Sequence, residues 1–349
     1  MGIVDSLAPA GSRRRAVVGG PARELVRYVS KLNLGARQPA AAHDEESKLK
    51  QSWAAYSPET LDAYLVSGYQ NPRINPQSII ARHFFVRQLF GSEFDDLMQE
   101  ELRFCVESNE ALRQRAAEMG VTMGVFTNPD KRAAVERVCA VIADREQIFE
   151  RRWREALAAK SAEPISVLEL ACGSANDYRS LASYGIARFL DYTGVDLNDK
   201  NIANAKARFA SVDFEVGSIL DLPYDDRSFD YVLAFDIFEH LSLPAMEQAM
   251  SEAVRLARRG LVFAFFIMTD AQEHNQRLKR SYHWNELSAS KIEEMLRAEF
   301  PHTQSRHIPT FLKQNFDYGH YYNKKAYTVV AERGLDGDPN SALWSAPLH

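Results

Sequence analysis

Three acidic residues and one histidine stand where short apolar segments of the sequence end. Glu169 lies in VLELACGSA, Asp196 closes TGVD, and Asp236 closes YVLAFD, with His240 four residues later. A carboxylate at the end of a buried strand can accept two hydrogen bonds from a ribose diol, and a histidine titrates near neutral pH, as a general base must. These residue types at these positions predict a site for an adenosine-containing cofactor beside a proton acceptor.

The turn after the first apolar segment contains a single glycine, Gly173, between Ala171 and Ala175. A dinucleotide-binding turn requires Gly-x-Gly-x-x-Gly, whereas alanine and asparagine stand at positions 171 and 176. We therefore expect a cofactor other than a nicotinamide dinucleotide. Alanine at position 171 costs little if its φ is negative, and the methyl groups of Ala171 and Ala175 are both small.

The second half of the chain alternates short apolar runs with helical stretches. This rhythm predicts a doubly wound α/β sheet with buried parallel strands. Ligands bind such sheets at the carboxyl ends of the strands, where the strand order reverses. The expected strands are 165–170, 192–195, 213–216, 231–235 and 261–267, and the expected intervening helices are 176–185, 200–209 and 244–258.

The segment 55–160 has helical spacing of its apolar residues and no alternating strand pattern. Capping residues precede prolines at Ser57-Pro58, Asn75-Pro76 and Asn128-Pro129, which is typical of helix starts. We expect this segment to be a helical cap or lid, or a surface for a homodimer. It would precede a domain at 161–333, with flexible tails at 1–54 and 334–349.

The composition excludes several classes of protein. The net charge of −5 gives no general attraction to nucleic acid, and the longest apolar run, Leu261–Met268, is too short to span a bilayer. The three cysteines are far apart and form no CxxC pair, which favours reduced thiols in a cytoplasmic protein. No set of ligands has the spacing of a metal site, so we expect no metal.

The first 40 residues are basic, with seven Lys and Arg against two acids, and the opening MGIVDS matches the loose myristoylation pattern at Gly2 and Ser6. Two interpretations stay open for this segment. One is a mobile tail whose charges are solvated, which we favour because the pattern is short. The other is a basic helix that lies on a membrane surface.

Four motifs occur in an order and spacing that resemble the class I S-adenosylmethionine-dependent methyltransferases, particularly the small-molecule branch. They are VLELACGSA, TGVDLND, VGSILDLPYDDRSFDYVLAFDIFEHL and GLVFAFF. The resemblance covers about 163–333 and implies a mostly parallel seven-stranded sheet. It also implies a reversed terminal hairpin, here a helix near 287–299, a strand near 303–309 and a last strand at 326–332. The implied activity is methyl transfer from S-adenosylmethionine to an oxygen or nitrogen of a small molecule.

The resemblance also implies roles for individual residues. Glu169, Ala171 and Gly173 would approach the methionine portion and backbone of the cofactor, and Asp196 would hold the ribose hydroxyls. The side chains expected around the adenine ring and the sulfonium are Leu197, Ser218, Ile219 and Asp236. The sequence departs from the family in two places: alanines replace two glycines of the turn, and Ser218 stands where the family often has an acid.

Two histidines are candidate bases, His240 after the fourth strand and His283 in the loop after the fifth. An aromatic cluster before the last strand is expected to pack in the core of the hairpin or to line a pocket (Phe311, Phe316, Tyr318, His320, Tyr321 and Tyr322). Two alternatives to small-molecule methylation remain. One is a non-catalytic module that binds an adenosine cofactor, and the other is a methyltransferase that acts on a protein.

Overall fold

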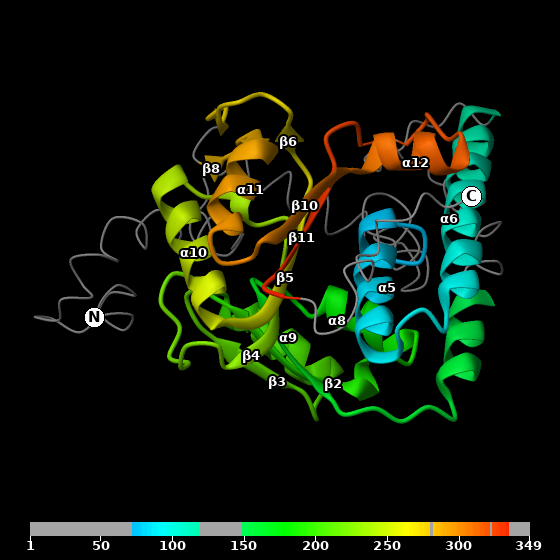
Figure 1. The fold of residues 1–349 in the computed structure, drawn as a ribbon, viewed down its shortest axis with the longest axis horizontal. Helices are drawn as coiled ribbons and strands as arrows, with labels where there is room; N and C mark the ends of the chain where they lie inside the picture. Colours follow the sequence, from blue (N-terminus) through cyan, green and yellow to red (C-terminus); the bar gives the residue numbers. More distant parts are fainter. Residues whose placement is uncertain (1–71, 119–147, 280–281, 322, 335–349) are drawn as a thin grey trace, which may run out of the picture.

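The computed structural model describes residues 72–118, 148–279, 282–321 and 323–334 (Figure 1). The expectations for the basic first 40 residues and for the final tail lie outside these ranges, as do those for Ser57-Pro58 and Asn128-Pro129. Within the described part of the chain, no helix is both long enough and apolar enough to cross a membrane.

A seven-stranded sheet has the order β10-β11-β5-β4-β1-β2-β3. The strands from β1 to β5 pair in parallel, whereas β11 is antiparallel to both β5 and β10. The expected doubly wound sheet with a reversed terminal hairpin is therefore confirmed. The strands are β1 Ile165–Leu170, β2 Leu190–Asp196, β3 Asp213–Val216, β4 Phe229–Phe235, β5 Ala257–Phe265, β10 His302–His307 and β11 Tyr327–Glu332.

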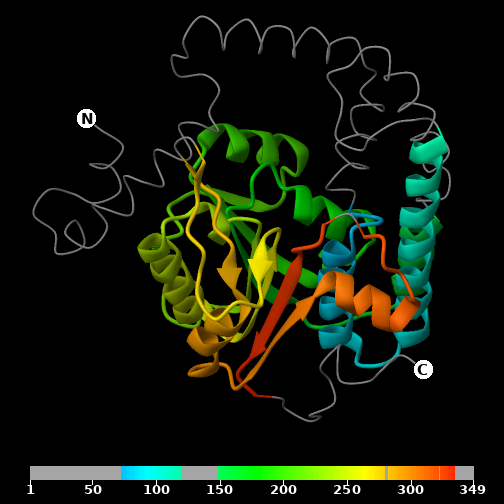
Figure 2. The ribbon, with the colours of Figure 1, turned by 90° about the horizontal axis from the view of Figure 1, so that it is seen from above.

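Helices cover both faces of the sheet (Figures 1 and 2). One face packs on α10 and α11 through side chains such as Leu168 and Phe263. The other face packs on α5 (Pro76–Phe90), α8 and α9 through side chains such as Val167 and Leu233. Because both faces are covered, the parallel strands read as continuous apolar runs. The helices are α8 Asn176–Ser183, α9 Asp199–Arg208, α10 Leu243–Leu256 and α11 Ala289–Arg297, with 3-10 turns η1 Ala187–Phe189 and η2 Phe238–His240.

The described part of the helical segment forms α5 Pro76–Phe90, α6 Asp95–Glu118 and a helix at 148–157. Asn75 caps α5 as expected, since its Oδ1 accepts a 2.9 Å hydrogen bond from the Gln77 amide and Pro76 begins the helix. Phe84 and Phe85 of α5 pack edge-on against Tyr231 of β4. These helices therefore share a core with the sheet, and α5 lies directly on one of its faces.

The expected hairpin contains a helix that the sequence did not lead us to expect, α12 Ile308–Phe316, between β10 and β11. In both views α12 reaches α6 (Figures 1 and 2). The aromatic residues of this region that are buried, Phe311, Tyr318 and Tyr321, pack with Ile79 of α5 and Leu102 of α6. These three side chains therefore serve core packing, but against the N-terminal helices rather than within the hairpin.

A segment after β5 folds over the end of the sheet in four short strands: β6 Met268–Thr269, β7 Leu278–Lys279, β8 Tyr282–His283 and β9 Leu287–Ser288. Asn285 anchors this segment. Its amide donates to the carbonyl of Glu239 over 2.9 Å, and its side-chain nitrogen donates to the carbonyl of Leu241 over 2.8 Å. The segment is thereby fixed to the η2 turn that follows β4.

Candidate functional site

A pocket of about 350 Å³ opens at the carboxyl ends of the parallel strands, within the range of small-molecule sites. It lies at the reversal of strand order, because β1 has β2 on one side and β4 on the other. Most of the residues that line it lie at or after the ends of β1, β2 and β4 or at the start of α5, and Ile219 after β3 and Ala264 of β5 complete it. They are Pro72, Asn75, Gln77, Ser78, Ala171, Cys172, Gly173, Asn176, Asp177, Asp196, Leu197, Asn198, Asn201, Ile219, Phe235, Asp236, Ile237 and Ala264.

The turn after β1 has a left-handed backbone at three positions. The φ angles are 57° at Ala171, 56° at Gly173 and 63° at Ala175. Alanine at position 171 would cost little only with a negative φ, and the structure does not meet that condition. The reason is that the chain must reverse sharply from β1 into α8, and two alanines adopt a conformation in which an L-residue costs roughly 1–2 kcal/mol.

Ala175 precedes α8 and is completely buried in the core that joins α5, α8 and the sheet. It is absent from the residues that line the pocket, whereas Ala171 and Gly173 are among them. A Cβ added at Gly173 would have no heavy atom within 4 Å. The turn therefore presents open space at Gly173, and the methyl group of Ala175 takes none of it.

Asp196 lies at the end of β2 and joins the turn to the following helix. Its Oδ2 accepts a 3.0 Å hydrogen bond from the Gly173 amide, and its Oδ1 accepts from the Asn198 amide at 2.7 Å and from the Asn201 side chain at 3.3 Å. A carboxylate has about four acceptor positions, so these three bonds leave capacity for a ligand. Burial raises the pKa of Asp196.

Asp236 follows β4 with a φ of 51°. Its Oδ1 is shielded from solvent and has no hydrogen-bond partner in the described part of the chain. Burial, and then the nearby carboxyls of Glu239 and Asp177, raise the pKa of Asp236 well above its ordinary value. Because Asp236 lines the pocket, a ligand bound there would supply the missing hydrogen-bond partner.

Asp177, in the first turn of α8, lines the same pocket and was not anticipated from the sequence. Burial raises its pKa to about 6. An acid in the first turn of a helix is common, because it complements the helix dipole. The sequence position of Asp177 therefore gave little indication of a binding role. Among the described lining residues Asp177, Asp196 and Asp236 are acidic and none is basic, so the pocket favours a cationic ligand.

Two predicted cofactor-binding residues lie beside the pocket rather than on its surface. Glu169 is 1% exposed, and its carboxylate accepts a hydrogen bond from the hydroxyl of Tyr192. Burial, followed by the charge of Asp177, raises the pKa of Glu169 well above its ordinary value. Ser218 is buried and its Oγ accepts from the Leu220 amide at 3.3 Å, which leaves its neighbour Ile219 to line the pocket.

The two candidate bases lie next to each other. Nδ1 of His240 is 3.3 Å from the carbonyl oxygen of His283, and the His240 ring is 5.0 Å from the Trp284 ring. Neither histidine is among the described residues that line the pocket. The structure therefore brings the two together at the base of the β7–β8 segment, while their catalytic role stays a prediction.

The start of α5 supplies a wall of the pocket that the sequence did not indicate. Asn75, Gln77 and Ser78 line it from this side. Gln77 is 7% exposed, and its Nε2 donates to the carbonyls of Phe265, at 3.2 Å, and Tyr327, at 2.7 Å. The helix is thus anchored to β5 and β11 next to the pocket. From the sequence, only the helix start at Asn75-Pro76 could be predicted, and a helix start does not show which strands the helix contacts.

Comparison with known proteins gives a consistent result. A family model described as a methyltransferase domain matches residues 167–260. A probable S-adenosylmethionine-dependent methyltransferase of Mycolicibacterium smegmatis is 32% identical over 133 residues, which are 37% of this chain and 49% of that protein. A fatty-acid O-methyltransferase of the same organism is 33% identical over 122 residues, which are 34% and 42% of the two chains. A norajmaline N-methyltransferase of Rauvolfia serpentina is 32% identical over 107 residues, or 29% and 35%. The chain thus spans less than half the length of these relatives.

Proposed function

Because the chain belongs to the class I S-adenosylmethionine-dependent methyltransferases, with the family domain at residues 167–260, we propose that it transfers a methyl group from S-adenosylmethionine to an oxygen or nitrogen of a small-molecule acceptor. Bound S-adenosylmethionine supplies an electrophilic methyl group on a positively charged sulfur. The protein must therefore bind this cation, align the acceptor and exclude water.

The residues of the pocket fit this cofactor. The open space at Gly173 admits a group close to the backbone, and Asp196 retains acceptor capacity for a ribose hydroxyl beside its three hydrogen bonds within the protein. Asp177 offers negative charge to the sulfonium or the amino group, Asp236 offers an acceptor oxygen without a partner, and no basic side chain among the described lining residues opposes them. Leu197 and Ile219 provide apolar surface for the adenine ring.

The observation that carries the proposal is the Asp236 carboxylate. Its buried Oδ1 lacks a partner at the switch point of the sheet, where a cationic ligand would complete its interactions. Burial of this oxygen without a ligand would cost free energy, about 1–3 kcal/mol for an unsatisfied group. A ligand with a positive charge and hydrogen-bond donors removes that cost.

The proposed acceptor is a small molecule, and lipid-like acceptors are included. The relatives that support this class are named for an oxygen of a fatty acid and a nitrogen of norajmaline. An acceptor hydroxyl must lose a proton as the methyl group is transferred, and an amine must react as its neutral form. The proposed proton acceptors are His240, which closely follows the pocket residues Asp236 and Ile237 along the chain, and its neighbour His283.

Calorimetry with S-adenosylmethionine and S-adenosylhomocysteine tests the proposal. We expect saturable binding of both, followed by incorporation of labelled methyl into members of an acceptor panel that contains fatty acids, phenols and amines. Absence of binding by either cofactor contradicts the proposal. Binding without transfer to small molecules, but with transfer to protein, would select the protein methyltransferase, and binding without any transfer would select the non-catalytic module.

A further inference from the structure

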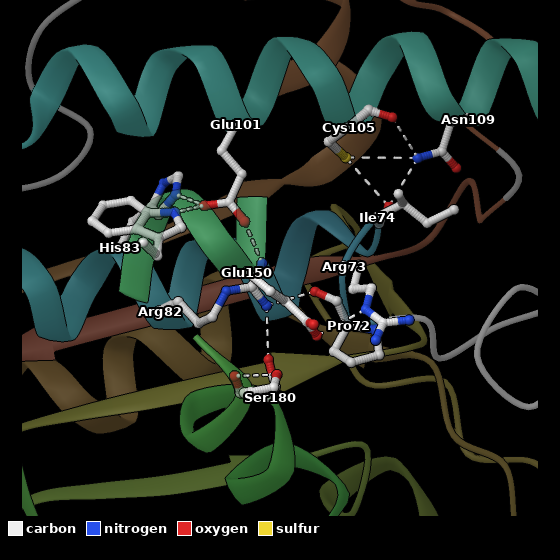
Figure 3. A network of polar contacts seen from close by, with 12 residues as sticks. Pro72, Arg73, Ile74, Arg82, His83, Glu101, Cys105, Asn109, Glu150 and Ser180 are labelled. Carbon is white, nitrogen blue, oxygen red and sulfur yellow. Dashed lines mark hydrogen bonds and ion pairs between the residues drawn. The ribbon is translucent and has the colours of Figure 1, made fainter. Parts of the chain in front are cut away.

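A buried polar network lies between the N-terminal helices and α8 (Figure 3). Arg82 of α5 is 1% exposed, and its Nη2 donates to Oε1 of the fully buried Glu101 of α6 over 2.6 Å. The second carboxylate oxygen, Oε2, is 2.7 Å from His83 Nε2 and accepts from Trp153 Nε1 at 2.6 Å. Four side chains from α5, α6 and the helix at 148–157 thus meet at one ion pair.

The other half of the Arg82 guanidinium connects this ion pair to the pocket. Nη1 donates to the carbonyl of Pro72 over 2.5 Å and to Oγ of Ser180 over 2.7 Å. Pro72 lines the pocket, and Ser180 belongs to α8, whose first turn contributes Asp177 to the same pocket. The guanidinium also lies over the ring of Tyr184, 3.7 Å from its centroid, at the end of α8.

Stability alone is a weak reason for this arrangement. A buried ion pair loses much of its Coulomb energy to desolvation, and apolar residues of similar volume are often equally stable. Nε of Arg82 is also buried without a partner. Apolar side chains could not replace the planar guanidinium as a donor. It binds the Pro72 carbonyl and the Ser180 hydroxyl at once and so fixes the distance between them.

We infer that Arg82 is a positioning residue for the pocket: its guanidinium fixes the Pro72 wall and the α8 wall relative to each other. Glu101 holds the guanidinium in place from the opposite side. The carboxylate stays ionised because Arg82 and His83 lower its pKa to about 2, although burial alone would raise it. The inference deepens the proposed function and rests on it only for the identity of the ligand.

Two substitutions on one helix test the role of the guanidinium. Ser180→Ala removes the hydroxyl that Arg82 binds, while Ser183→Ala removes a hydroxyl of the same helix that donates to the Ser180 carbonyl at 3.3 Å and has no bond to Arg82. Arg82→Lys is the stronger variant, because one ammonium cannot reproduce the fork geometry. Three measurements are made on the full chain: the Kd for S-adenosylhomocysteine, the Tm, and amide hydrogen exchange of residues 73–79 and 176–183 without ligand.

For Ser180→Ala we expect Kd to rise about threefold to tenfold, because α8 is no longer held at a fixed distance from Pro72, and Tm to fall modestly, because a buried N–H of Arg82 loses its partner. Exchange at 73–79 and 176–183 should accelerate, while Ser183→Ala should match the wild type. Equal Kd and equal exchange in the two serine variants would overturn the inference, even if Arg82→Lys fails to fold. If the wild type binds no cofactor, the proposed function fails, and the exchange measurement still decides the role of Arg82.

Discussion

The amide of Gly173 donates a 3.0 Å hydrogen bond to Oδ2 of Asp196, so the turn after β1 is joined directly to the end of β2. The two residues are 23 positions apart in sequence. The bond holds the carboxylate toward the pocket and holds the turn in its left-handed conformation. Asp196 is therefore both a candidate ligand for ribose and a support for the glycine that the cofactor approaches.

Replacing Asp196 should abolish cofactor binding. Asp196→Ala removes the ribose acceptor and the partners of the Gly173 and Asn198 amides, and we expect at least a 100-fold loss of affinity. Calorimetry with S-adenosylhomocysteine measures this loss. Asp191→Asn is the control, because Asp191 lies on the same strand with an exposed side chain. Wild-type affinity in Asp196→Ala would contradict the assignment.

Cofactor affinity should rise with pH through the titration of Asp177. The pKa of this carboxyl is raised to about 6 by burial, so it becomes negatively charged as pH increases from 5 to 7. The charged form attracts the sulfonium, and we expect affinity for S-adenosylmethionine to increase roughly fivefold over this range. S-adenosylhomocysteine, which lacks the sulfonium charge, should show a smaller increase. The pH dependence should flatten in Asp177→Asn, and a profile identical to that of the wild type would refute the role of Asp177.

Replacing either alanine of the turn by glycine should change the free energy of unfolding, but by different amounts at the two positions. Ala171→Gly relieves a left-handed alanine that is only partly buried, and we expect a gain of about 0.5–1 kcal/mol in the free energy of unfolding. Ala175→Gly relieves a similar conformation but removes a completely buried methyl group, which offsets the gain by about 0.8 kcal/mol. Chemical denaturation compares the two variants. A destabilised Ala171→Gly would show that the turn does not strain this alanine.

His240→Ala should leave cofactor affinity unchanged and lower turnover about 100-fold, the usual contribution of a general base. His283→Ala is the matched comparison, because it keeps the backbone carbonyl that lies 3.3 Å from His240. Single-turnover rates with an acceptor from the panel distinguish the two histidines. Unchanged turnover in His240→Ala would remove it as the base, and loss in His283→Ala alone would assign that role to His283.

The central strands could be predicted because each is buried on both faces. The run 165–170 coincides with β1, since side chains such as Val167 and Leu168 enter opposite cores. The prediction began β5 too late, at Leu261, whereas the strand begins at Ala257. The early part contains Arg258, which is paired at 2.7 Å with Asp230 and so gives no apolar signal.

The pocket was predicted only in part, because the wall formed by the start of α5 depends on contacts between residues far apart in sequence. Gly173, Asp196 and Asp236 follow from their places after strands, which local sequence reveals. Gln77 reaches carbonyls 188 and 250 residues away, and no local pattern encodes those contacts. α12 was missed for another reason: Pro309 at its start was a usable signal, but the expected hairpin left no room for a helix.

The packing of α12 against α5 and α6 has a consequence for synthesis of the chain on the ribosome. Ile79 and Leu102 are translated more than 200 residues before Ile308 and Phe311, which bury them. At roughly 5–20 residues per second, these two helices wait on the order of 10–40 s for the surface that covers them. Until then, α12 does not cover these apolar side chains. They would offer a binding surface to chaperones that hold nascent chains.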